Sequence, residues 1–181
     1  MILMENTNAP SKSYLQFGVL FGIIMVLMFV VTYISGIDVM KDKALATTSS
    51  IFNYIILPPL FIYLGCNAFK KENNGYVSFI ECLKIGVSIV FVAALVLGIF
   101  NIAFNFIFPE FMDSILKNSK QIMLEQDPNL TSEQVEMALS MARKFSAWYI
   151  SLPMTLVVFS FLGLVYSLII GLIVKNDNPQ F

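Results

Sequence analysis

Residues 14–35 read YLQFGVLFGIIMVLMFVVTYIS, a stretch that contains no charged side chain and has a tyrosine near each end. A helix of about 20 apolar residues crosses the hydrocarbon core of a bilayer, and tyrosines gather at the two membrane–water interfaces. The stretch therefore predicts a transmembrane helix, and with it a protein whose fold is built in lipid.

Three further stretches have the same character, at about residues 50–68, 85–108 and 147–174. A transmembrane β-barrel would instead show alternating segments of about ten residues. We therefore predict an all-α integral membrane protein in which residues 1–181 form one membrane domain. It has four transmembrane helices, at about 14–35, 50–68, 85–108 and 147–174, and an extramembrane helical insert at 109–146.

The composition agrees with this class of protein and argues against several kinds of chemistry. The 181 residues are 57% hydrophobic and 13% charged, with a mean hydropathy of +0.78, whereas an average soluble domain is about 25% charged. The net charge of −1 gives no attraction to nucleic acid. There is no histidine, the usual general base and metal ligand. Cys66 and Cys82 have no metal-ligand spacing. We therefore expect no catalytic residue, no metal and no cofactor.

Small residues recur at intervals of four or eight along three of the predicted spans. In lipid, such stripes let helices approach closely. We interpret them as packing surfaces inside the bundle, with a stripe that makes an oligomer as the alternative. The residues are Gly18 and Gly22 in the first span, Gly86, Ala94 and Gly98 in the third, and Gly163, Ser167 and Gly171 in the fourth.

Polar side chains inside the spans are the candidates for a binding site. An amide in lipid needs a partner and should face the bundle interior. These residues either form hydrogen bonds between helices or line a pocket for a lipid headgroup or small solute. They are Asn53 in the second span, Asn101 and Asn105 on one face of the third, and Ser151, Thr155 and Ser160 in the fourth. The pair Pro58-Pro59 removes two backbone donors from the second span and predicts a kink there.

No acidic or basic residue lies deep within a span, which argues against an ion-coupled pump. With four spans both termini lie on one side, and the lysines that adjoin several span ends favour the cytoplasm for that side. The first apolar stretch is too long for a signal peptide and is expected to be retained. The opening MILMEN leaves open whether Met4 is the native start.

The insert resolves into two predicted helices, the second within DPNLTSEQVEMALSMARKF at 127–145. Pro109-Glu110 opens the first helix, and Thr131 with Gln134 forms a capping box for the second. The apolar arc of the second helix covers more than half of its circumference, too wide for a helix free in water. We therefore predict an amphipathic helical hairpin that packs on its sister helix, the membrane interface or a partner. The predicted docking residues are Val135, Leu139, Met141 and Phe145.

The stretch FIECLKIGVSIVFVAALVLGIFNIAFNFIFPEFMD, the LTSEQVEMA segment and the ending GLVYSLIIGLIVK together resemble a bacterial family catalogued as domain of unknown function 4199. The resemblance covers nearly the whole chain. It implies a small inner-membrane protein of four spans with no assigned catalytic residue. It also implies an accessory role beside a polyprenyl-phosphate glycosyltransferase.

Two functions follow as hypotheses. The first is a non-enzymatic accessory or structural subunit that docks a protein partner, or a second copy, through the insert. The alternative is a protein that binds or transports a lipid or small solute on the Asn53, Asn101 and Asn105 face. Membrane lipid is a partner in either case.

Overall fold

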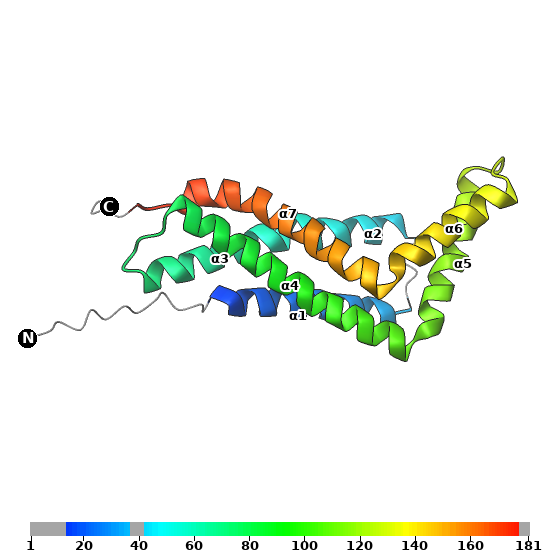
Figure 1. Ribbon diagram of the computed structural model, residues 1–181, viewed down its shortest axis with the longest axis horizontal. Helices are drawn as coiled ribbons and strands as arrows, with labels where there is room; N and C mark the ends of the chain where they lie inside the picture. Colours follow the sequence, from blue (N-terminus) through cyan, green and yellow to red (C-terminus); the bar gives the residue numbers. More distant parts are fainter. Residues whose placement is uncertain (1–13, 37–41, 178–181) are drawn as a thin grey trace, which may run out of the picture.

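The computed structural model describes residues 14–36 and 42–177, and every regular element within them is a helix (Figure 1). The elements are α1 (Leu15–Ile34), α2 (Lys43–Ser50), the π-helix η2 (Ile51–Ile56), α3 (Leu57–Glu72), α4 (Phe79–Ile107), α5 (Pro109–Gln126), α6 (Ser132–Ser146) and α7 (Trp148–Val174). Four helical runs are long and apolar enough to cross a membrane: Leu15–Ile34, Ala44–Glu72, Phe79–Ile107 and Trp148–Val174. The predicted all-α membrane fold with four spans is confirmed.

The spans form an elongated bundle in which α4 contacts α1, α3 and α7. The start of α1, the turn between α3 and α4 and the end of α7 lie at one end of the bundle, and α5 and α6 extend from the other (Figure 1). We call these the terminal end and the insert end.

Glycines set the distance between α1 and α4. A Cβ added at Gly18 would lie 2.7 Å from the carbonyl oxygen of Ile89, and one at Gly22 would lie 2.6 Å from the Cβ of Val96. Real Cβ atoms do not approach other atoms so closely, so neither position has room for a side chain. The two glycines therefore hold α1 against α4 within one chain.

The contact between α4 and α7 has the same construction. A Cβ at Gly86 would overlap the hydroxyl of Ser167, which is fully buried, and one at Gly163 would lie 3.3 Å from the Cα of Val87. Gly171 faces Phe79, and a Cβ at Gly98 would overlap Leu152. Ala94 is also fully buried. These small residues therefore face neighbouring helices of the same bundle.

Backbone pairing closes the terminal end. Val77, in the turn before α4, exchanges two hydrogen bonds with Asn176, which follows α7: the Val77 amide donates at 3.0 Å and the Asn176 amide at 2.8 Å. Lys70 donates from Nζ to the carbonyl of Val174 at 2.9 Å, where a cation is favoured at a helix C-terminus. Ser78 and Glu81 form a capping box at the start of α4. The ends of α3, α4 and α7 are thereby joined.

The second span is longer than predicted, since Ala44–Glu72 is one helical run rather than residues 50–68. Its centre is a π-helix, in which the amide of Leu57 donates to the carbonyl of Phe52, five residues earlier. Pro58 and Pro59 follow directly and carry no amide hydrogen. The proline pair was expected to cause a kink, and in the structure the turn before it is widened into a π-helix.

Five aromatic rings bring α1, α4 and α5 together at the insert end. Phe104 is central: its ring lies 5.0 Å from those of Phe29 and Tyr33, 4.9 Å from that of Phe108 and 5.2 Å from that of Phe111. Most of the pairs are close to perpendicular, the arrangement that aromatic quadrupoles favour. This cluster fixes the point at which the insert leaves the bundle.

Within the insert, α5 and α6 contact each other. Leu116 of α5 and Val135 of α6 are buried, and the guanidinium of Arg143 forms an ion pair of 2.9 Å with Asp113 on α5. The expected capping box of Thr131 and Gln134 is present at the start of α6. Val135, one of the four predicted docking residues, is therefore used inside the insert and is only 2% exposed.

Candidate functional site

Three cavities lie at the insert end of the bundle, and neighbouring cavities share lining residues. The first, of about 140 Å³, lies between α4 and the junction of α6 with α7; the second, of about 260 Å³, lies between α1, η2 and α4. The third, of about 400 Å³, runs along α7 beside Tyr54 and Phe145. Asn101 lines the first and second cavities, Ser151 the first and third, and Tyr54 the second and third. We treat the three as one composite site.

The π-helix explains why space opens here. The α2–η2 half of the second span packs mainly on its own continuation, whereas α3 contacts α1, α4 and α7. No residue of η2 is buried, although Leu57 and Pro58, which follow it directly, are. The second span is therefore well packed only after the proline pair, and the cavities lie beside the loosely packed half.

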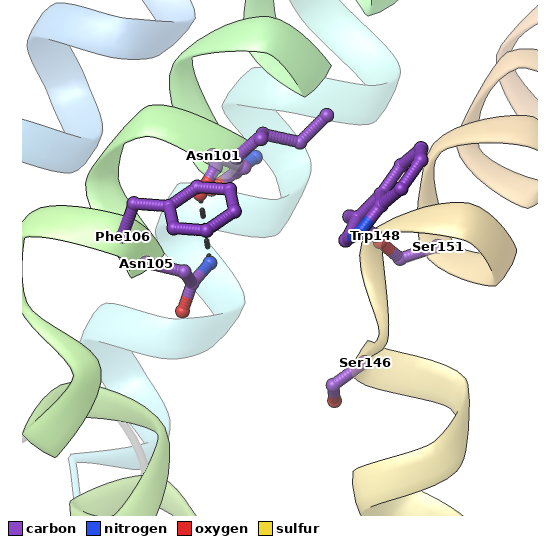
Figure 2. Close-up of a pocket in the computed structure, with 7 residues that line it drawn as sticks. Asn101, Asn105, Phe106, Ser146, Trp148 and Ser151 are labelled. Carbon is purple, nitrogen blue, oxygen red and sulfur yellow. Dashed lines mark hydrogen bonds between the residues drawn. The ribbon is translucent and has the colours of Figure 1, made fainter.

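Asn105 presents an unpaired oxygen in the first cavity. Its Nδ2 donates to the carbonyl of Asn101 at 2.8 Å, and its Oδ1 is buried and accepts no hydrogen bond from any residue that the structure describes. Figure 2 shows both asparagines on α4, facing Trp148 and Ser151 of α7 across the cavity, with Ser146 of α6 on the same side as α7. A buried acceptor without a partner costs about 1–3 kcal/mol, so this oxygen favours any ligand that donates a hydrogen bond.

Asn53 has the same property in the second cavity. It lies on η2, and its Oδ1 is buried with no partner among residues 14–36 and 42–177. Thr32 and Ser49 line the same cavity, and Thr32 already donates to the carbonyl of Met28 at 2.8 Å. π-Helical turns occur frequently at functional sites. The composite site thus holds two unsatisfied acceptors on two different spans.

The third cavity is an apolar groove with a polar end. Ser151 and Thr155 are its polar contributions from α7, and the remainder of its lining on that helix is Met154, Val158, Phe159 and Leu162. Such a lining suits a hydrocarbon chain and offers it few hydrogen bonds. The composite site therefore combines two cavities that hold polar side chains among apolar ones with a third, largely apolar groove.

Among the described residues, none that lines the three cavities is charged. In the part of the chain that the structure describes, no three His, Cys, Asp or Glu side chains gather as a metal site would require. Cys66 and Cys82 are buried neighbours at the terminal end, with the Cys66 thiol 3.9 Å from the Cys82 carbonyl. The site's chemistry is that of neutral hydrogen bonding and apolar contact.

The sequence placed Asn53, Asn101 and Asn105 on a common face, and the structure brings all three to the composite site. Ser151 and Thr155 join them, whereas Ser160 lines none of these cavities. The aromatic residues Tyr54, Phe106 and Trp148 were not predicted to belong to the site, although their position next to the polar residues on the same helices was a usable signal. Of the predicted docking residues, Leu139 is partly buried, and Met141 and Phe145 are 53% and 56% exposed.

Fold and site together define a multi-pass membrane protein with an uncharged, partly polar site at one end of its helical bundle. The family described as "Protein of unknown function (DUF4199)" matches residues 16–176, and the chain belongs to this family. Neither a curated protein nor a solved structure matches the sequence.

Proposed function

We propose that the protein binds a neutral lipid whose headgroup carries hydroxyl groups. The headgroup lies in the first and second cavities, and a hydrocarbon chain lies in the third cavity along α7. The observation that carries this proposal is the pair of buried, unpartnered oxygens, Asn53 Oδ1 and Asn105 Oδ1. Each needs a donor, and a hydroxyl group supplies one. A role in binding or transport fits this lining, in which the described side chains are uncharged.

The uncharged lining selects against ionic headgroups. A phosphate diester carries a full negative charge and is normally met by Arg, Lys or a helix N-terminus, whereas the described lining offers neutral hydroxyl, amide and indole groups. Transfer of an unpaired charge into such a site costs far more than transfer of a hydroxyl group. A diacylglycerol or a glycosylated diacylglycerol therefore fits better than a phospholipid.

Native mass spectrometry of the full chain in detergent tests this function. The probes are dioleoylglycerol and dioleoylphosphatidylglycerol, which share their acyl chains and differ in charge. We expect the wild-type protein to retain dioleoylglycerol preferentially. Asn53→Leu and Asn105→Leu should each weaken its binding by about tenfold, since a hydrogen bond of about 1.4 kcal/mol corresponds to that factor.

Asn67→Leu is the matched control. Asn67 also lies in the second span, but its Nδ2 donates to the carbonyl of Tyr63 and it lines none of the three cavities. Its substitution should leave binding unchanged. Equal binding by the wild-type, Asn53→Leu and Asn105→Leu proteins, or a preference for phosphatidylglycerol, would rule out this function for the site.

We also propose that the protein lies in the bacterial inner membrane with both termini in the cytoplasm. Four lysines support this orientation because they lie beside the ends of spans at the terminal end of the bundle: Lys70, Lys71, Lys84 and Lys175. Basic residues next to spans favour the cytoplasmic side. A reporter that is active only in the periplasm should be inactive when fused to the C-terminus and active when inserted at Asn129. The reverse pattern would contradict this orientation.

Docking of a protein partner on the insert stays a prediction of the sequence. A polyprenyl-phosphate glycosyltransferase remains the partner that the family resemblance implied, and a second copy of the chain is the other.

A further inference from the structure

The second helix of the insert has an exposed apolar stripe that the bundle does not cover. Met137, Met141 and Phe145 recur every four residues along α6 and are 56%, 53% and 56% exposed. At about 100° per residue they lie within about 80° of one another on the helix surface. The stripe is distinct from the face of α6 that carries Val135, which is 2% exposed.

The opposite side of α6 carries charged and polar side chains. Arg143 lies about 200° around the helix from Met141, and its guanidinium is paired with the exposed carboxylate of Asp113. Both side chains of that pair are more than 60% exposed, at 67% and 73%. Glu136 and Ser140, between Arg143 and the stripe on the helix surface, are exposed as well.

The stripe continues into the lipid-facing surface of the fourth span. Phe145 lines the third cavity together with Met154 and Val158 of α7, so it points towards the membrane-spanning part of the molecule. Only Ala147 separates α6 from α7, and the first residues of α7, Trp148 and Tyr149, are 57% and 62% exposed. Tryptophan and tyrosine at a span end mark the level of the lipid headgroups.

The junction with α7 brings the end of α6 close to the membrane-spanning part of the molecule. In Figure 1 α5 and α6 extend beyond the insert end of the bundle, and α6 runs obliquely back to the start of α7. The last turns of α6, which carry Met141 and Phe145, therefore lie nearest the bundle. Lys144 borders the stripe on the helix surface, where a long basic side chain can reach the phosphate groups.

From these observations we propose that α6 lies in the membrane interface, with Met137, Met141 and Phe145 inserted among the lipid headgroups and upper acyl chains. The occupant of the exposed stripe is the bilayer itself. The helix therefore lies in the interface beside the third cavity. Its placement does not depend on what that cavity binds.

Tryptophan fluorescence of the full chain in vesicles can test the placement, because Trp148 is the only tryptophan in the sequence. In a Trp148→Phe background, Met141→Trp places a new tryptophan on the stripe, and Ser140→Trp places the matched control about 100° away on the exposed polar side. The vesicles contain phosphatidylcholine with or without bromine atoms on the upper acyl chain, and iodide is the quencher in water.

We expect brominated lipid to quench the tryptophan at 141 and iodide to leave it largely unaffected, with the opposite pattern at 140. Quenching of both positions by iodide would show that the stripe faces water. Protection of position 141 from both quenchers would show that protein covers it, either a second copy or a partner. Each of these two results overturns the proposal, and Met137→Trp repeats the test should Met141→Trp fail to fold.

Discussion

The hydroxyl of Tyr166 on α7 donates a hydrogen bond of 2.8 Å to the backbone carbonyl of Tyr54 in η2. In an α-helix this carbonyl would accept from residue 58, and in a π-helix it would accept from residue 59. Both are proline and have no amide hydrogen. Tyr166 therefore supplies, from another span, a donor for a carbonyl that the proline pair leaves without a backbone partner.

Tyr166→Phe should destabilise the protein by about 1–3 kcal/mol, the cost of leaving a backbone carbonyl without a donor away from water. The free energy of unfolding can be measured by titration of mixed micelles with dodecyl sulfate, followed by circular dichroism. Tyr149→Phe removes the hydroxyl of a tyrosine that is 62% exposed and should change the free energy little.

A second substitution identifies the cause. Pro58→Ala restores an amide that can donate to the Tyr54 carbonyl, so the effect of Tyr166→Phe should be much smaller in that background. A coupling energy near zero between the two positions would mean that the effect of the Tyr166 hydroxyl does not arise from the missing amide of Pro58.

The spans and caps were readable from the sequence because they depend on local patterns. Uncharged apolar stretches determine the four membrane-crossing helices, and the capping box of Thr131 depends on residues three apart. The asparagine face of α4 follows from helical periodicity in the same way. These features need no knowledge of the neighbouring helix.

The π-helix and the composite site were not readable in full because they depend on contacts between distant segments. The sequence shows that the proline pair lacks two backbone donors. A kink, a break or a π-helix could each accommodate this loss, and the sequence does not distinguish them. The Tyr54 carbonyl in the π-helix accepts from Tyr166, which lies 112 residues further along the chain. Likewise, Trp148 and Phe106 line one cavity only because α4 and α7 meet at the insert end.

The contact between Gly86 and Ser167 yields a prediction about packing. Gly86→Ala should destabilise the bundle by about 1–3 kcal/mol, because the added methyl group overlaps the buried Ser167 side chain. Adding Ser167→Gly to Gly86→Ala should recover most of the loss, since the smaller residue then sits on the other helix. Unfolding in mixed micelles measures both variants.

The oligomeric state of the same variants distinguishes the two interpretations of the small-residue stripes. Gly86 faces α7 of its own chain, so Gly86→Ala should leave the mass of the protein–detergent complex unchanged in light scattering. A fall in mass, with stability unaffected, would instead indicate that this stripe joins two copies.

The unpaired oxygen of Asn53 predicts that replacing this residue does not lower the free energy of unfolding. In the ligand-free protein, Asn53→Leu removes a buried acceptor that has no partner, and it should leave the free energy of unfolding unchanged or raise it by about 1 kcal/mol. If Asn53 were instead part of a hydrogen bond between helices, the same substitution would lower stability by about 1 kcal/mol. Delipidated protein in mixed micelles gives the comparison, and the two expectations differ in sign.

The aromatic cluster predicts that one phenylalanine holds the insert in place while another, two residues further on, does not. Phe104 is 6% exposed and its ring contacts those of Tyr33 and Phe111, whereas Phe106 is 75% exposed. Phe104→Ala should cost about 3–5 kcal/mol, as large-to-small changes of buried aromatic residues do, and Phe106→Ala should cost far less. Because Phe104 links α1 to α5, its loss should also increase amide hydrogen exchange in the first turns of α5. If exchange there rises equally in both variants, the cluster is not what anchors the insert.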